Sequence, residues 1–394
     1  MASIIFHIDV NSAYLSWTSV ENLKNHTGPD LRDIPAIIGG DQKSRHGIVL
    51  AKSIPAKKFG IYTSEPIVSA LRKCPNLVIA PPNHKLYRSY SERLMDYLKS
   101  LTPEIEQVSI DECYLDFTKI AAHYASPEDA AREIKDTVYE RFGFTVNVGI
   151  STNKLLAKMA SDFTKPNRVH TLYPNEIEKK MWPLPVEELY MAGHSSVATL
   201  HKIGIRTIGE LARTDPGILT LHLKSHGKLL WEYANGIDDR PVVSAPVKAK
   251  GIGNSTTLSR DGSCEEDAAA VLNSLAQNVS RRLKKAGQLA GNLSVEIKYH
   301  TFVTNSHQMP LDPPTDSAKA LYSASLKLFS RLWNGEPFRL LGIRTTHLSE
   351  ADAPVQMNLF DIDWEKKARL KKLDDALLKV KNKYGNDVVH KGPT

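Results

Sequence analysis

The order of strand-like and helix-like segments in residues 4–163 constrains the fold more than any other feature of the chain. Apolar alternation typical of strands covers residues 4–10, 104–109, 113–117 and 145–150, and helical periodicity covers 85–100 and 127–141. Without the segment 35–77, which we treat as an insertion, the order is β-α-β-β-α-β. This is the split βαβ pattern of a ferredoxin-like sheet, in which the first strand lies beside the central hairpin.

Three acidic residues lie at the ends of these strands. Asp9 ends the first strand, and Asp111 and Glu112 form the turn of the hairpin. The predicted topology brings the three carboxylates to one edge of the sheet. Mg²⁺ binds proteins through one or two carboxylates, and a pair of such ions can activate an attacking oxygen and stabilise a leaving one. The pattern favours a two-metal site, whereas any one of these acids taken alone could simply end its strand.

Composition and charge exclude several classes of protein. The chain has 394 residues, enough for several domains of about 100–200 residues each. Its net charge of +7 fits a polyanionic partner. Its three cysteines are far apart and form no CxxC pair, so the sequence indicates neither a disulfide framework nor a zinc site. No apolar run approaches roughly 18 residues, and Asp9 interrupts the N-terminal apolar stretch. We therefore expect a cytoplasmic protein with no membrane contact.

The remaining segments predict further domains. Residues 173–236 read as short helices joined by Gly-containing turns at 191–194 and 202–209. Such turns can present backbone N–H groups to a phosphate, but an ordinary helical bundle fits this segment equally well. The Pro-containing stretch 238–246 resembles a linker. Residues 247–348 predict a second α/β unit, with helices at 265–286 and 316–333 and strands at 293–299 and 339–345.

The tail contains one unusual apolar segment. Gln356–Phe360 places Leu359 and Phe360 side by side in a polar stretch. Apolar anchors on such a segment are typical of a peptide that fills a pocket on a partner.

Several motifs resemble the Y-family of translesion DNA polymerases, especially the bacterial polymerase IV-like enzymes. The resemblance covers nearly the whole chain, and it is carried by the segments His7–Tyr14, Ser109–Asp116, Val148–Lys158 and Asp162–Asn167. It implies a multidomain fold of α/β and α+β type: a ferredoxin-like palm with a fingers insertion, a helix-hairpin-helix-type thumb and an α/β little finger. The implied extents are palm 1–12 and 78–170, fingers 13–77, thumb 171–240, linker 241–246, little finger 247–350 and tail 351–394.

The resemblance also implies roles for the acids. Asp9, Asp111, Glu112 and the carbonyl of Val10 match positions that hold two Mg²⁺ ions while the primer 3′-hydroxyl attacks the α-phosphate of a dNTP. Asp116 lies on the same hairpin but matches no metal ligand, and we treat it as structural.

Other residues match the family's nucleotide contacts. Lys165 matches the lysine that reaches the triphosphate. Tyr14, five residues after Asp9, matches the steric gate, whose ring leaves no room for a ribonucleotide 2′-hydroxyl; otherwise it is a core aromatic residue. In the fingers, where the family usually offers Tyr and Arg, this chain has Ile54 and Lys57. Lys57 keeps the charge without the guanidinium fork, so we expect weaker dNTP binding.

The resemblance implies partners as well. Gln356, Leu359 and Phe360 belong to a peptide similar to the one that binds the bacterial sliding clamp, a β ring, which raises processivity by tethering. Primer-template DNA and dNTP are the implied substrates, and we expect a monomer. Since every segment is already assigned, the chain has no room for a proofreading exonuclease, which predicts low-fidelity translesion synthesis.

Two other functions compete with this one. A nucleotidyl cyclase also uses paired acids on a ferredoxin-like sheet, but it does not explain the helical turns, the second α/β unit or the docking peptide. A clamp-associated DNA-binding protein with an inactive polymerase fold is the other alternative. Loss of an acid would favour that second alternative, whereas all three acids are present.

Overall fold

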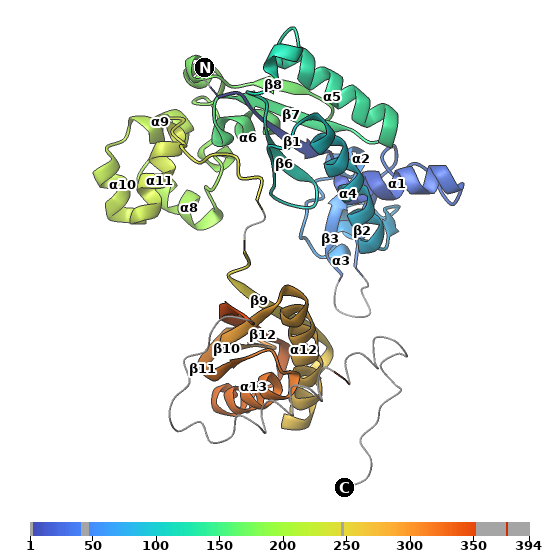
Figure 1. Ribbon diagram of the computed structural model, residues 1–394, viewed down its shortest axis with the longest axis vertical. Coiled ribbons are helices and arrows are strands. Elements are labelled where there is room, and N and C mark those ends of the chain that lie inside the picture. The colour runs from blue at the N-terminus through green and yellow to red at the C-terminus, as the bar shows by residue number, and fades with distance from the viewer. Residues whose placement is uncertain (1–2, 41–46, 246–247, 352–375, 377–394) are drawn as a thin grey trace. The chain divides into compact units, whose positions relative to one another are not determined.

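The computed structural model describes residues 3–40, 47–245, 248–351 and 376 (Figure 1). The described residues form two compact units, one of residues 3–40 with 47–245 and one of residues 248–351. The predicted docking peptide 356–360 lies outside the described residues. Among the described helices, none combines the length and apolar composition that crossing a lipid bilayer requires.

The first unit is built around a five-stranded sheet with the order β5-β6-β1-β7-β8. Its strands are β1 (Ile5–Val10), β5 (Ile105–Gln107), β6 (Glu112–Asp116), β7 (Val146–Ser151) and β8 (Val169–Thr171). β1 pairs antiparallel with both β6 and β7, so it lies between the hairpin and the fourth strand, as the split βαβ pattern predicts. β8 adds a parallel edge strand beyond β7 that we had not predicted.

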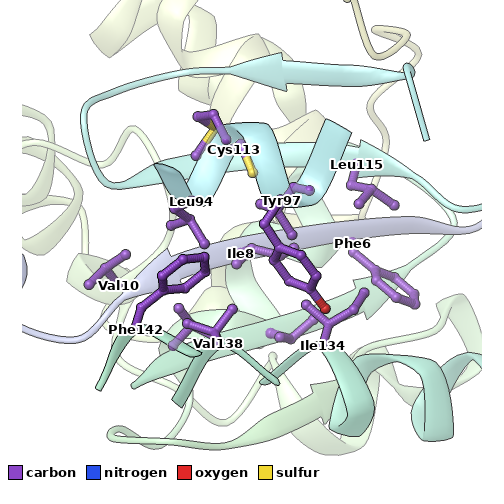
Figure 2. Packing of buried hydrophobic residues seen from close by; sticks show 14 of the residues in the cluster. Phe6, Ile8, Val10, Leu94, Tyr97, Cys113, Leu115, Ile134, Val138 and Phe142 are labelled. Atoms are coloured by element: carbon purple, nitrogen blue, oxygen red, sulfur yellow. The ribbon is translucent and has the colours of Figure 1, made fainter. Parts of the chain in front are cut away.

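Period-2 alternation gives this sheet two different faces. Phe6, Ile8 and Val10 point to a core shared with helices α4 (His84–Leu101) and α5 (Pro127–Phe142), as Figure 2 shows. The alternate residues of β1 point to the opposite face, where Ile5 packs with Ala157 of α6 (Lys154–Asp162). Asp9 shares the register of Ile5 and therefore belongs to the α6 face.

A second, three-stranded sheet with the order β3-β2-β4 forms most of the inserted region. Its strands are β2 (Ala36–Gly39), β3 (Val49–Lys52) and β4 (Val78–Ala80), accompanied by helices α1 (Ala13–Asn25), α2 (Ile54–Lys58) and α3 (Ile67–Lys73). β4 pairs in parallel with β2. This strand therefore completes the inserted sheet, although the predicted fingers–palm boundary after residue 77 assigned it to the palm.

Short helices follow the five-stranded sheet, as predicted. They are α7 (Ile177–Lys180), α8 (His194–Lys202), α9 (Ile208–Arg213), α10 (Pro216–Leu223) and α11 (Ser225–Ala234). Their core includes Leu155, Leu156 and Met159, so α6 packs against both the sheet and this helical group. Thr207 begins α9 with a capping box, since its side chain accepts from the Glu210 amide and Glu210 accepts in return from Thr207.

The second unit is a four-stranded antiparallel sheet with the order β11-β10-β12-β9. Its elements are β9 (Gly251–Gly262), α12 (Glu265–Ala286), β10 (Gln288–Tyr299), β11 (Thr304–Thr315), α13 (Ala318–Leu332) and β12 (Phe338–Glu350). Leu293, Val295 and Ile297 pack in a core with the two helices. The other face of the sheet holds an open depression of about 460 Å³ with Ser294, Glu296 and Arg344 in its lining.

Candidate active site

The acids at the end of the first strand and in the hairpin turn come together, as the topology predicts. Asp9 and Glu112 are direct partners in the β1–β6 register. The Val10 amide donates to the Asp111 carbonyl at 3.0 Å. The Ser109 hydroxyl donates to Asp111 Oδ1 at 2.7 Å and accepts from the Glu112 amide at 3.2 Å. The Ser109 hydroxyl therefore fixes the Asp111 carboxylate and the Glu112 backbone within the turn.

Burial and neighbouring charges shift the pKa values of the two acids of the turn in opposite directions. His7, whose Nε2 lies 3.6 Å from Glu112 Oε2, is the largest cause that lowers the pKa of Glu112, and with Lys158 it holds that pKa at about 2. Glu112 is therefore ionised at neutral pH. Burial raises the pKa of Asp111, and the negative charges of Asp9 and Glu112 raise it further. The three carboxylates thus repel one another, and a cation placed among them would relieve that repulsion.

His7 lies behind Glu112, inside the protein. Its ring is 1% exposed, and Nδ1 lies 2.8 Å from the Ser161 hydroxyl of α6. Burial lowers the pKa of His7 below its usual value, so the ring is neutral near pH 7. Sequence reasoning did not single out this residue, although its position two residues before Asp9 on the same face of β1 was a usable signal.

Lysines contact two of the three acids. Lys165 Nζ binds Asp9 Oδ2 and also lies 2.9 Å from Asp162 Oδ1. Lys158 Nζ lies 3.1 Å from Glu112 Oε2. Burial alone would lower the pKa of Lys165, but the carboxylates of Asp9 and Asp162 outweigh it and raise that pKa. Lys158 and Asp162 were not among the predicted site residues.

The donor set suits a hard divalent cation. Three carboxylates from two neighbouring segments supply the oxygen ligands that Mg²⁺ prefers. Within residues 3–40, 47–245 and 248–351, no group of three or more His, Cys, Asp or Glu side chains lies close enough together to hold a metal ion. Lys165 and Lys158 instead engage carboxylate oxygens of Asp9 and Glu112. A cation would therefore compete with these ammonium groups for the same oxygens.

Tyr14 lies at the start of α1 and forms part of an aromatic wall. Its ring stacks on Tyr87 with centroids 4.3 Å apart and meets His84 edge-on at 6.0 Å. Burial raises the pKa of the Tyr14 hydroxyl, and the charge of Asp111 raises it further.

The two departures in the inserted region lie on α2. Ser53 caps this helix by accepting from the Ala56 amide at 3.0 Å. Ile54 is 50% exposed, and Lys57 is also exposed. Among the described residues, no side-chain hydrogen bond or ion pair joins Ile54 or Lys57 to Asp9, Asp111 or Glu112.

The comparisons with known proteins agree with this architecture. The family model described as the impB/mucB/samB family matches residues 8–162, and the model of that family's C-terminal domain matches residues 249–359. The chain belongs to this family, and its resemblance to the Y-family of DNA polymerases is confirmed.

Named relatives and a solved structure define the similarity more closely. DNA polymerase IV of Clostridium acetobutylicum is 46% identical over 389 residues, which cover 99% of this chain and 97% of the relative. DNA polymerase IV 1 of Bacillus subtilis is 37% identical over 99% of this chain and 93% of its own length. A solved Y-family DNA polymerase chimera of Dbh and Dpo4 aligns with a TM-score of 0.77 at 21% identity, covering 88% of this chain and 99% of the chimera. The predicted multidomain α/β and α+β fold is confirmed.

Proposed function

We propose that this chain is a template-directed DNA polymerase of the translesion class, which adds dNTPs to a primer 3′-hydroxyl without proofreading. One observation supports the assignment of this reaction to particular residues. Asp9 and Glu112 lie opposite each other on neighbouring strands, with Asp111 in the adjoining turn. The agreement of 46% with a DNA polymerase IV over nearly its whole length supports the reaction class. Members of this family depend on divalent metal ions.

In this proposal Asp9, Asp111, Glu112 and the Val10 carbonyl hold two Mg²⁺ ions. Bound there, the ions supply positive charge that activates the primer hydroxyl and stabilises the leaving pyrophosphate. Glu112 contributes a carboxylate that is ionised at neutral pH, since His7 and Lys158 hold its pKa at about 2. Asp9 lies at the end of a buried strand that is paired on both edges, which fixes its position.

In this proposal, residues other than the three acids bind the nucleotide. Lys165, already among the acids, carries the positive charge that would meet the triphosphate. Tyr14 acts as the steric gate, because its ring is held by the stack on Tyr87 and cannot easily move aside for a 2′-hydroxyl. Lys57 adds a second charge from the fingers.

The domain assignments complete the proposal. Residues 1–12 and 78–170 act as palm, apart from β4, which pairs into the fingers sheet; residues 13–77 act as fingers, 171–240 as thumb, 241–246 as linker and 247–350 as little finger. The open polar face of the β11-β10-β12-β9 sheet is the surface we assign to DNA, because its opposite face is covered by helices. Residues 356–360 dock on the sliding clamp. A monomeric state and a cytoplasmic location remain predictions.

Primer extension on a primed template tests the reaction and its acids together. Wild type should extend a primer with Mg²⁺ and dNTPs, whereas Asp111→Ala should bind the same DNA without extending it. Asp116→Asn is the matched control, since it alters an acid at the other end of β6 and should retain extension. Extension by Asp111→Ala at the wild-type rate would overturn the assignment of the acids.

A further inference from the structure

An unbroken series of ion pairs connects two of the acids through α6. Glu112 pairs with Lys158 at 3.1 Å, and Lys158 lies 3.4 Å from Asp162. Asp162 in turn lies 2.9 Å from Lys165, which binds Asp9. Asp162 is the central member of this series, and it gives each lysine a second carboxylate.

The sheet holds this series in place. Gly149 of β7 faces α6 so closely that an added Cβ would lie 2.0 Å from the Ala157 carbonyl oxygen. The loop after α6 is also fixed, because the Asn147 side chain donates to the Ser161 carbonyl at 3.0 Å and the Thr164 carbonyl at 2.7 Å. The spacing between Asp162 and the acids of β1 and β6 is therefore set by rigid elements.

The two lysines are the competitors that a divalent cation meets at this site. An ammonium with two carboxylate partners divides its attraction between them, whereas an ammonium with one partner concentrates it there. If Asp162 were neutral, Lys165 would retain Asp9 and Lys158 would retain Glu112 as their carboxylate partners in the series. Loss of the Asp162 charge also makes the local potential more positive. Both effects oppose cation binding.

We propose that Asp162 is a positioning residue for divalent-cation binding, because it shares Lys158 with Glu112 and Lys165 with Asp9 and so weakens the hold of each lysine on its site acid. This inference rests on the proposed function, since it assumes that those acids hold the cations. It assigns a role to a residue that touches neither the acids nor a reacting atom. Asp162 acts through the two lysines.

Electron paramagnetic resonance can measure Mn²⁺ binding to the full chain in the absence of DNA and nucleotide. This measurement tests the proposal independently of turnover. Asp162→Asn should raise the Mn²⁺ dissociation constant roughly two- to fivefold, the effect expected from the loss of one partly exposed charge. The Mg²⁺ concentration for half-maximal primer extension should rise by a similar factor, whereas kcat at saturating Mg²⁺ stays within about twofold. Asp162→Glu, which keeps the charge, should restore both values.

The controls separate this role from a structural one. Asp136→Asn removes the same charge from an exposed position on α5 and should leave Mn²⁺ binding unchanged. An unaltered Mn²⁺ dissociation constant in Asp162→Asn would overturn the proposal, as would a fall in kcat shared by Asp162→Asn and Asp162→Glu. Absence of primer extension by wild type would instead overturn the proposed function, and full extension by Asp111→Ala would overturn its assignment of the acids, so these failures are distinguishable from failure of the role of Asp162.

Discussion

The ring of Tyr14 lies against the ring of Tyr87 with centroids 4.3 Å apart and planes only 8° apart. The stack joins the start of α1 to α4. Tyr87 is fully buried, and its hydroxyl lies 3.1 Å from that of Thr18. Tyr14 is thus held from behind by a fixed partner, which is what a side chain needs if it is to exclude a substrate by its volume.

Truncation of this ring should relax the choice of sugar. We expect Tyr14→Ala to raise ribonucleotide incorporation relative to deoxyribonucleotide incorporation by at least about tenfold, because a cavity replaces the ring. Tyr14→Phe keeps the ring and should keep the discrimination. Single-nucleotide kcat/KM values for matched rNTP and dNTP pairs provide the measurement. Equal discrimination by Tyr14→Ala and wild type would show that the ring is merely part of the core.

We expect dNTP to bind more tightly when the family's usual donors are restored on α2. The double substitution Ile54→Tyr with Lys57→Arg adds a hydroxyl and a guanidinium fork, which together should lower the dNTP KM about five- to tenfold. Lys58→Arg makes the same chemical change at the neighbouring exposed lysine and serves as the control. An unchanged KM in the double variant would mean that α2 does not approach the triphosphate.

The docking peptide should affect processivity and not chemistry. Deletion of residues 356–360 is expected to leave distributive synthesis at the wild-type rate and to abolish stimulation by a loaded sliding clamp. Product-length distributions with and without clamp provide the measurement. Substitution of Leu359 and Phe360 by Ala should reproduce the deletion. Equal stimulation of the deleted chain would exclude this segment as the clamp contact.

The parts of the fold that sequence predicted are those with a strong apolar period. The helix expected at 265–286 matches α12, and the buried strand Ile5–Val10 was evident from its alternation. β9 and β11 were missed because their side chains are mostly polar and few of them are buried, and because Pro310, Pro313 and Pro314 argued against a strand in β11. An edge position resolves this conflict, since β11 is the edge strand of the described order β11-β10-β12-β9 and Pro is tolerated at sheet edges.

The three acids could be predicted from the sequence, whereas the residues that contact them from α6 could not. Asp9, Asp111 and Glu112 lie at strand ends, and the topology alone brings such positions together. Lys158 and Asp162 approach them only because α6 packs closely on β7 and β1, a tertiary fact that no local pattern encodes. Their i, i+4 spacing was visible in the sequence, but this spacing is also typical of an ordinary exposed helical ion pair.

A buried glutamate that pairs with a lysine in the inserted region should make stability depend on acid pH. Glu65 is 1% exposed; it accepts from the Tyr62 amide at 2.7 Å and from Lys73 Nζ at 2.8 Å. Burial alone would raise the pKa of Glu65, but these hydrogen bonds outweigh it and hold the pKa below its usual value. A lowered folded-state pKa stabilises the protein above the unfolded pKa of about 4.3, and this stability is lost as pH falls through the folded value.

Glu65→Gln should therefore lower the free energy of unfolding at pH 7 by about 1–3 kcal/mol, since a charged hydrogen-bonding partner is lost from a buried site. The difference from wild type should shrink as the pH falls below about 4. Urea unfolding at several pH values measures it. Glu92→Gln, on the exposed side of α4, is the control and should change little. A difference that stays constant down to pH 3 would contradict the assigned ionisation of Glu65.

Gly149 shows how the close approach of α6 to the sheet can be tested. An added Cβ would lie 2.0 Å from the Ala157 carbonyl oxygen and 2.4 Å from the Ser161 amide nitrogen, both in backbone that cannot give way. Gly149→Ala should therefore destabilise the protein by about 3 kcal/mol, the upper part of the range for overpacked sites. Gly193→Ala is the matched control, because no atom lies within 4 Å of its added Cβ. The substitution at Gly149 should also shift Lys158 and Ser161 away from Glu112 and His7, so Mn²⁺ affinity should change together with the urea midpoint. Loss of stability with unaltered Mn²⁺ affinity would show that α6 supports the fold without setting the geometry of the acids.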